Sequence, residues 1–184
     1  MHKVQSLSTK SYTLSIASIK IGDEFDSAQE LLTFDPTDTH HHIPALLDTG
    51  SPCIMLPGGQ EDGTMLRSPY SLYQDYAKKW SKMFITVNGI NVGLELNRAD
   101  LEVEHHTFLD QAWGTSVRPC VMPVNWAMKP PHQTPIVLGA VFFRAYNVLF
   151  DLSKSSPSVP PTLGVNLLCK PSALAYLRCA NLVR

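Results

Sequence analysis

The chain has 184 residues, enough for the buried core of a single domain, and its formal net charge at pH 7 is −1. Apolar residues make up 44% and charged residues 17%, a balance that is typical of globular proteins and excludes intrinsic disorder. The near-neutral charge gives no attraction to nucleic acid or an anionic membrane, and no apolar run approaches bilayer-spanning length. We therefore expect neither a nucleic acid nor a membrane as a partner.

The first part of the chain alternates strand signals with loops. Residues 1–10 lack the apolar core of a signal peptide, so we expect an N-terminal extension there and leave the compartment unassigned. Apolar and polar residues alternate with one slip across residues 12–21, which predicts a strand. Residues 25–42 are polar and predict a variable loop. Short apolar runs predict buried strands at 43–47 and 53–56.

The middle of the chain predicts one helix and one hairpin. Ser68 is a suitable N-cap and Pro69 a suitable first helical residue. Leu, Tyr, Ala and Trp then recur at helical spacing, which predicts an amphipathic helix over about residues 68–81. An Asn-Gly pair at residues 88–89 lies between two apolar runs and predicts a β-hairpin, and strand signals continue across residues 93–106.

The last part of the chain is dominated by its most hydrophobic stretch. Residues 110–135 are rich in Pro and Trp and predict an irregular loop. Residues 136–150 predict two buried strands, and a last strand is expected at 164–168 after a loop. The tail, residues 169–184, is compatible with a short helix. The fold class that follows is mainly β, with one amphipathic helix and short helical turns.

The cysteines and histidines give no sign of a metal centre. Two consecutive histidines at 105–106 and three at 40–42 are expected on exposed loops, because neighbouring side chains cannot all face one ion. The spacing of the cysteines fits neither a zinc site nor a disulfide scaffold, so free or partly paired thiols are expected. We predict no metal and no cofactor. The four cysteines are Cys53, Cys120, Cys169 and Cys179.

Two motifs stand out as candidates for chemistry. The apolar residues 45–47 lead directly into Asp48-Thr49-Gly50-Ser51, so a buried strand ends in a carboxylate on a Thr-Gly turn. The second motif, at residues 136–151, reads IVLGAVFFRAYNVLFD. Asp-Thr-Gly alone is a short pattern that arises by chance, whereas the long second motif in the same chain and in this order is specific.

Together the motifs resemble the C-terminal lobe of the pepsin-like aspartic proteases, and the similarity covers about residues 11–168. In that family the second motif reads roughly apolar-Leu-Gly-Asp-x-Phe-x-Arg-x-Tyr, followed by Phe-Asp. The strand at 12–21, the helix after the Asp turn and the hairpin at 88–89 also resemble family elements. The resemblance implies a single lobe of the pepsin-like fold, with residues 169–184 as a C-terminal tail. Family members are mostly secreted or vacuolar.

The resemblance also implies roles for individual residues. Asp48 would be a catalytic carboxylate, and Thr49 would bond to the opposite turn of a partner lobe. Gly50 would offer its backbone N–H to the carboxylate, and Ser51 would bond the outer carboxylate oxygen. Leu138-Gly139 would support the turn, because a glycine without Cβ allows a close backbone crossing.

This chemistry implies a partner as well as a polypeptide substrate. Aspartic proteases use two carboxylates that share a proton, yet no second Asp-Thr-Gly or Asp-Ser-Gly occurs in this sequence. We expect the second carboxylate from an N-terminal protease lobe or from a homodimer partner. Uncovered inter-lobe surface would then make the isolated chain dimerise or aggregate.

Three departures from the family pattern keep a second reading open, that of a non-catalytic lobe that binds peptides or proteins. Ala140 stands where the family usually has an Asp, and Pro52 removes a backbone N–H beside the turn. The family's disulfide in this lobe is expected to be absent, because residues 77–80 offer no cysteine to pair with Cys120.

Overall fold

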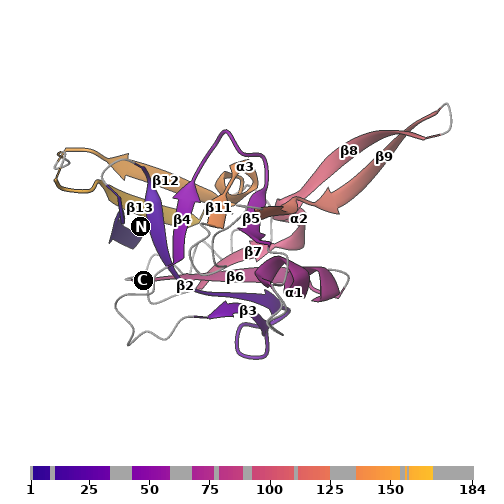
Figure 1. Cartoon of the computed structure of the whole chain (residues 1–184), viewed down its shortest axis with the longest axis horizontal. Coiled ribbons are helices and arrows are strands. Elements are labelled where there is room, and N and C mark those ends of the chain that lie inside the picture. The colour runs from indigo at the N-terminus through magenta and orange to yellow at the C-terminus, as the bar shows by residue number, and fades with distance from the viewer. Residues whose placement is uncertain are drawn as a thin grey trace.

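The computed structural model describes residues 2–8, 11–33, 43–58, 68–76, 79–88, 93–109, 112–124, 136–153, 156 and 158–167. The chain is mainly β, as predicted, and short helices lie around the sheets (Figure 1). Within these ranges no helix has the length and apolarity that a membrane crossing requires. The strands are β1 (His2–Gln5), β2 (Thr13–Gly22), β3 (Gln29–Thr33), β4 (Ile43–Leu47), β5 (Ile54–Pro57), β6 (Lys82–Val87), β7 (Gly93–Asn97), β8 (Glu102–Leu109), β9 (Ala112–Pro119), β10 (Val121–Val124), β11 (Ile136–Leu138), β12 (Tyr146–Asp151) and β13 (Thr162–Leu167). The helices are α1 (Pro69–Tyr76), α2 (Arg98–Leu101) and α3 (Ala140–Phe143).

The largest sheet has eight strands, in the order β10-β5-β11-β4-β2-β6-β7, with β3 paired to β2 beside this path. Most neighbours are antiparallel, but β11 runs parallel to β4 and β10 runs parallel to β5. In the β11–β4 pair, Leu138 lies opposite Leu47, so the two strands end side by side. This register places the residues that follow both strands at one edge of the sheet.

Strand β2 runs through the centre of the core. Leu14, Ile16, Ile19 and Ile21 are each at most 2% exposed. The slip in their alternation coincides with a register shift in the β2–β6 pair between Ile16 and Ser18. A bulge of this kind keeps apolar side chains on the buried face despite the extra residue, so the strand prediction at 12–21 is confirmed.

The predicted loop at residues 25–42 is wrong for residues 29–33, which form β3 against β2. Leu31 is buried and Leu32 partly buried, so this strand adds to the core. Its two apolar residues are adjacent, and period-2 alternation was therefore too short to reveal it. Residues 34–42, including the predicted histidine loop, lie outside the described part of the chain.

Helix α1 begins as the sequence predicts. The Ser68 hydroxyl accepts a hydrogen bond from the Ser71 backbone N–H at 3.2 Å, which is N-cap geometry, and Pro69 takes the first helical position. Tyr73 is buried, and its ring contacts the buried ring of Trp80 edge-on at 6.1 Å. The helix is described only to Tyr76, and the segment just before β6 is not helical, so the predicted end at residue 81 is wrong.

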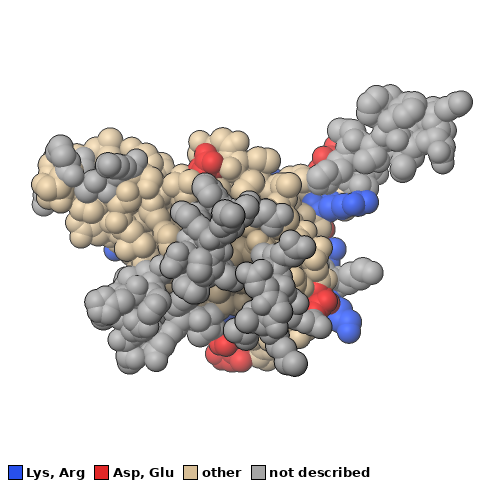
Figure 2. Space-filling view, viewed as in Figure 1, with Lys and Arg blue, Asp and Glu red and all other residues tan. Residues whose placement is uncertain are grey.

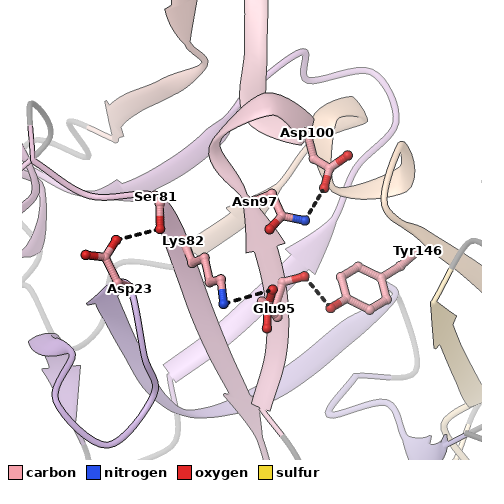
Figure 3. Close-up of polar contacts among 7 residues, drawn as sticks. All are labelled: Asp23, Ser81, Lys82, Glu95, Asn97, Asp100 and Tyr146. Atoms are coloured by element: carbon pink, nitrogen blue, oxygen red, sulfur yellow. Dashed lines mark hydrogen bonds and ion pairs between the residues drawn. The ribbon is translucent and has the colours of Figure 1, made fainter. Parts of the chain in front are cut away.

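The predicted hairpin is present as the antiparallel pair β6–β7, although residues 89–92 are outside the described ranges. Polar contacts join the two strands of this hairpin and also connect the hairpin to its surroundings (Figure 3). The Lys82 Nζ lies 3.7 Å from Glu95 Oε1, and the Tyr146 hydroxyl donates to the Glu95 carbonyl at 2.7 Å. The Ser81 hydroxyl donates to the exposed Asp23 at 2.6 Å. Of these contacts, the bond from Tyr146 to Glu95 fixes the start of β12 to β7.

The predicted loop at residues 110–135 is also wrong over much of its length. Strand β9 pairs antiparallel with β8, and the two form a ribbon that extends away from the body at the upper right of Figure 1. Strand β10 joins the large sheet beside β5. Both strands are held by interstrand hydrogen bonds. Their sequences contain Pro, Gly and polar residues and therefore show no clear alternation of apolar and polar residues. Residues 125–135 are not described.

A separate three-stranded sheet has the order β1-β13-β12. Residues 2–5, which the sequence places in an N-terminal extension, form its edge strand β1. The sequence predicts strand throughout the hydrophobic stretch that precedes β12, but the stretch divides at Gly139 into β11 and α3. Within α3, Phe142 is fully buried and stacks on Tyr146 with ring centroids 5.0 Å apart.

Cys120 is paired after all, with Cys53 and not with any residue of 77–80, so among the free or partly paired thiols that the sequence left open these two are paired. Cys53 and Cys120 form a disulfide with a Cα–Cα distance of 4.7 Å, across a sequence separation of 67. The two residues directly precede β5 and β10, whose parallel pairing brings them together. Their sequence spacing carries no sign of this, because the pairing depends on a long-range crossover. Closing a loop of this length contributes about 4 kcal/mol to stability by the chain-entropy estimate. Cys169 and Cys179 are outside the described part of the chain.

Candidate active site

The Asp48 turn is delivered by a strand at the centre of the large sheet. In β4, the side chains of Ile43, Ala45 and Leu47 are buried, and the strand lies between β2 and β11. At its end the Leu47 N–H donates to the Tyr12 carbonyl at 2.9 Å, and the Asp48 N–H donates to the Leu138 carbonyl at 3.2 Å. Neighbours on both sides therefore fix the backbone that carries the carboxylate.

The Asp48 carboxylate is held by its own turn. Oδ1 accepts the Gly50 backbone N–H at 2.9 Å, and Oδ2 accepts the Ser51 hydroxyl at 2.7 Å. Both bonds favour the charged form, so the Ser51 hydroxyl first and the Gly50 N–H second hold the pKa of Asp48 below its ordinary value of 3.8. The side chain is thus held in orientation by two hydrogen bonds that favour its charged form, and it is still partly exposed.

The residues that leave the turn are held by the start of α3. The Ala140 N–H donates to the Ser51 carbonyl at 2.7 Å, and the Val141 N–H donates to the Pro52 carbonyl at 3.2 Å. These bonds require the backbone at Gly139 to pass very close to residues 51–53, and a Cβ on Gly139 would overlap the carbonyl oxygens of Ser51 and Cys53. The glycine is therefore needed for space.

The structure brings together the residues that the sequence assigned to the site. Asp48, Gly50 and Ser51 form one hydrogen-bonded turn, and buried Leu138 and Gly139 lie directly beside it. Thr49 is exposed within the turn. Its expected bond to an opposite turn would need another lobe.

Sequence reasoning missed the amides of Ala140 and Val141 and the disulfide at Cys53. The amides act through the backbone, so their residue types carry no signal. Cys53 could have been noticed from its place two residues after Ser51. Among the residues that the structure describes, no group of three or more His, Cys, Asp or Glu side chains is placed to hold a metal ion.

Replacing Ser51 by alanine is expected to raise the pKa of Asp48 toward 3.8, because it removes the largest cause of the lowered value. A depressed carboxyl pKa stabilises the fold above the unfolded-state pKa, and this contribution is lost as the pH falls through the folded-state pKa. The acid side of the stability profile should therefore be flatter in Ser51→Ala. Carboxyl-carbon NMR titration measures the pKa, and Ser51→Thr, which keeps the hydroxyl, is the matched control. An unchanged pKa in Ser51→Ala would contradict this assignment.

Comparison with known protein families agrees with this geometry. The family model for eukaryotic aspartyl proteases matches residues 1–160, a range that contains the Asp48 turn and the segment from β11 to β12 beside it. No curated protein matches the chain. Because the family model spans most of the sequence, the chain is a member of the eukaryotic aspartyl protease family.

Proposed function

We propose that this chain is one lobe of an aspartic-type endopeptidase and that Asp48 supplies one of two carboxylates that activate water against a peptide bond. The geometry of Asp48 gives the strongest support. Its carboxylate lies at the open end of a buried strand, and each oxygen accepts one hydrogen bond from the same turn. A general base needs this combination of a fixed orientation and access to the reacting water.

The proposed reaction needs a second carboxylate close to the first. Two carboxylates a few ångström apart cannot both ionise easily, so one of them retains a proton. The Gly50 and Ser51 bonds favour charge on Asp48, which takes the proton of the water in this scheme. The partner carboxyl polarises the peptide carbonyl and protonates the leaving nitrogen. No covalent intermediate with the enzyme forms.

The second carboxylate comes from an N-terminal protease lobe or from a second copy of this chain. Exposed apolar side chains around β12 support such a contact, and the surface over β12 and β13 at the left of Figure 2 carries little charge. Tyr12 connects this surface to the site, because its carbonyl bonds the residue that precedes Asp48. The exposed apolar residues on and beside the three-stranded sheet are Leu7, Tyr12, Leu149, Leu152 and Val159.

One observation favours the alternative, a non-catalytic lobe that binds peptides or proteins. Ala140 lies directly against the turn through its amide, yet its side chain offers no carboxylate where the family usually has one. Pro52 weighs less, because its carbonyl still accepts the Val141 N–H and the outgoing segment remains anchored. The two functions differ in whether a peptide bond is cut.

Cleavage of a denatured protein substrate at acidic pH, with and without pepstatin, separates the two functions. The chain should be assayed alone and with a candidate N-terminal lobe, and light scattering should report whether it is a monomer or a dimer. We expect pepstatin-sensitive cleavage by the dimer or the two-lobe assembly and none by the monomer. Binding of peptides without cleavage in a verified assembly would favour the alternative.

A further inference from the structure

The Cys53–Cys120 disulfide is attached to the segment that leaves the Asp48 turn. Cys53 follows the turn by two residues, and both cysteines are only 4% exposed. Cys120 is itself held on both sides of its peptide unit. Its N–H donates to the Leu101 carbonyl at 2.8 Å, and its carbonyl accepts the Ile54 N–H at 3.0 Å. The disulfide thus connects the outgoing segment of the turn to a point that α2 and β5 already fix.

The two sides of the turn are supported differently. The incoming side is strand β4, which is paired with β2 up to Leu46 and with β11 up to Leu47. The outgoing side, residues 51–53, precedes β5 and contains Pro52, which has no N–H to donate. Its carbonyls at residues 51 and 52 accept the two amides of α3. The covalent link at Cys53 supplements these bonds at the point where the chain enters β5.

We propose that the Cys53–Cys120 disulfide is a positioning element of the Asp48 site, which keeps residues 50–51 placed so that both carboxylate oxygens stay hydrogen-bonded. The proposal rests on the proposed function only for its catalytic meaning. Because a displacement of Cys53 is transmitted through Pro52 alone to Ser51 and its hydroxyl, loss of the disulfide loosens this turn before it loosens the rest of the sheet. The site is thereby made sensitive to thiol reductants.

A variant without the disulfide tests this inference in the isolated chain. Cys53→Ala combined with Cys120→Val retains apolar packing and removes the covalent link. Relative to the parent chain, hydrogen exchange of the Gly50, Ala140 and Val141 amides should accelerate by a factor at least about ten times larger than the factor for β6 amides, because opening is local. The pKa of Asp48 should rise toward 3.8 as the Ser51 bond weakens. Val165→Ala, a buried change in β13 away from the turn, is the stability control.

The proposal would be overturned if exchange accelerated equally in the turn and in β6 and the Asp48 pKa were unchanged. The disulfide would then stabilise the fold as a whole and would have no specific effect on the turn. Should the double variant not fold, the folded chain can be reduced with dithiothreitol. This reagent converts the disulfide to two thiols and becomes a cyclic disulfide itself, while pulsed exchange follows the same amides. Neither readout depends on protease activity. If the cleavage assay shows no activity, this test can therefore still be carried out. If cleavage is observed but exchange accelerates equally in the turn and in β6, only the inference about the disulfide is contradicted.

Discussion

Replacing Asp48 by asparagine is expected to lower pepstatin-sensitive cleavage by on the order of 10³-fold or more in whichever assembly cleaves peptides. Asparagine has nearly the same shape, but it stays neutral and cannot take a proton from water. Initial rates at several acidic pH values measure the effect. Because Asp48 is partly exposed and bonded within its own turn, the variant should still fold.

Asp23→Asn provides the matched control for this prediction. Asp23 is exposed, lies in the turn after β2 and accepts the Ser81 hydroxyl (Figure 3), away from the Asp48 turn in the chain. The Asp23→Asn variant makes the same change of carboxylate to amide, and its rate of peptide cleavage should equal that of the parent. Equal rates for Asp48→Asn and the parent, with inhibition by pepstatin retained, would remove Asp48 from the mechanism. The observed cleavage would then come from another site or a contaminant.

Much of the fold could be predicted from the sequence because its signals are local. The apolar run before Asp48 predicts β4 correctly, and the Ser68-Pro69 pair predicts the start of α1. The slip within residues 12–21 even corresponds to the register shift in β2. In each case the signal lies within a few neighbouring residues, since caps, turns and alternation act over a short stretch of chain.

The errors arise where distant parts of the chain decide the structure. Strands β9 and β10 exist through pairing with β8 and β5, so their own residues show no clear period. The disulfide depends on the same long-range pairing. The residues of α3 are as apolar as those of a buried strand, but the chain turns after Gly139 so that two amides can bond the Asp48 turn.

The candidate site shows the same division. The sequence pattern singles out Asp48, Gly50, Ser51 and Gly139, because a resemblance can be matched to residue types. The bonds from the α3 amides involve backbone atoms that every residue but proline possesses, so no residue type reveals them. The resemblance implies a close backbone crossing at Gly139, and the structure identifies what is crossed, because a Cβ at this position would overlap the carbonyl oxygens of residues 51 and 53.

Replacing Gly139 by alanine is expected to lower the free energy of unfolding by about 3 kcal/mol, the upper end of the usual cost of overpacking. The backbone at Gly139 is extended, with φ −82° and ψ −166°, so alanine meets no torsional obstacle there. The cost comes from space, because the new Cβ would overlap the carbonyl oxygens of Ser51 and Cys53. Both are backbone atoms of the segment that leaves the Asp48 turn. They can move only if the α3 bonds to that segment break or shift.

Gly93→Ala is the matched control for this prediction. A Cβ there would meet the ring of Phe25 at 3.1 Å, but that ring is a side chain at the surface and can move aside. Urea unfolding should therefore show a small change, under about 1 kcal/mol, for Gly93→Ala and a large loss for Gly139→Ala. The Asp48 pKa should rise only in Gly139→Ala, because the same displacement moves Ser51. If both variants were equally stable, the close approach of Gly139 to residues 51–53 would accommodate a Cβ. The position of the turn would then depend on β4 and the disulfide and not on the bonds from α3.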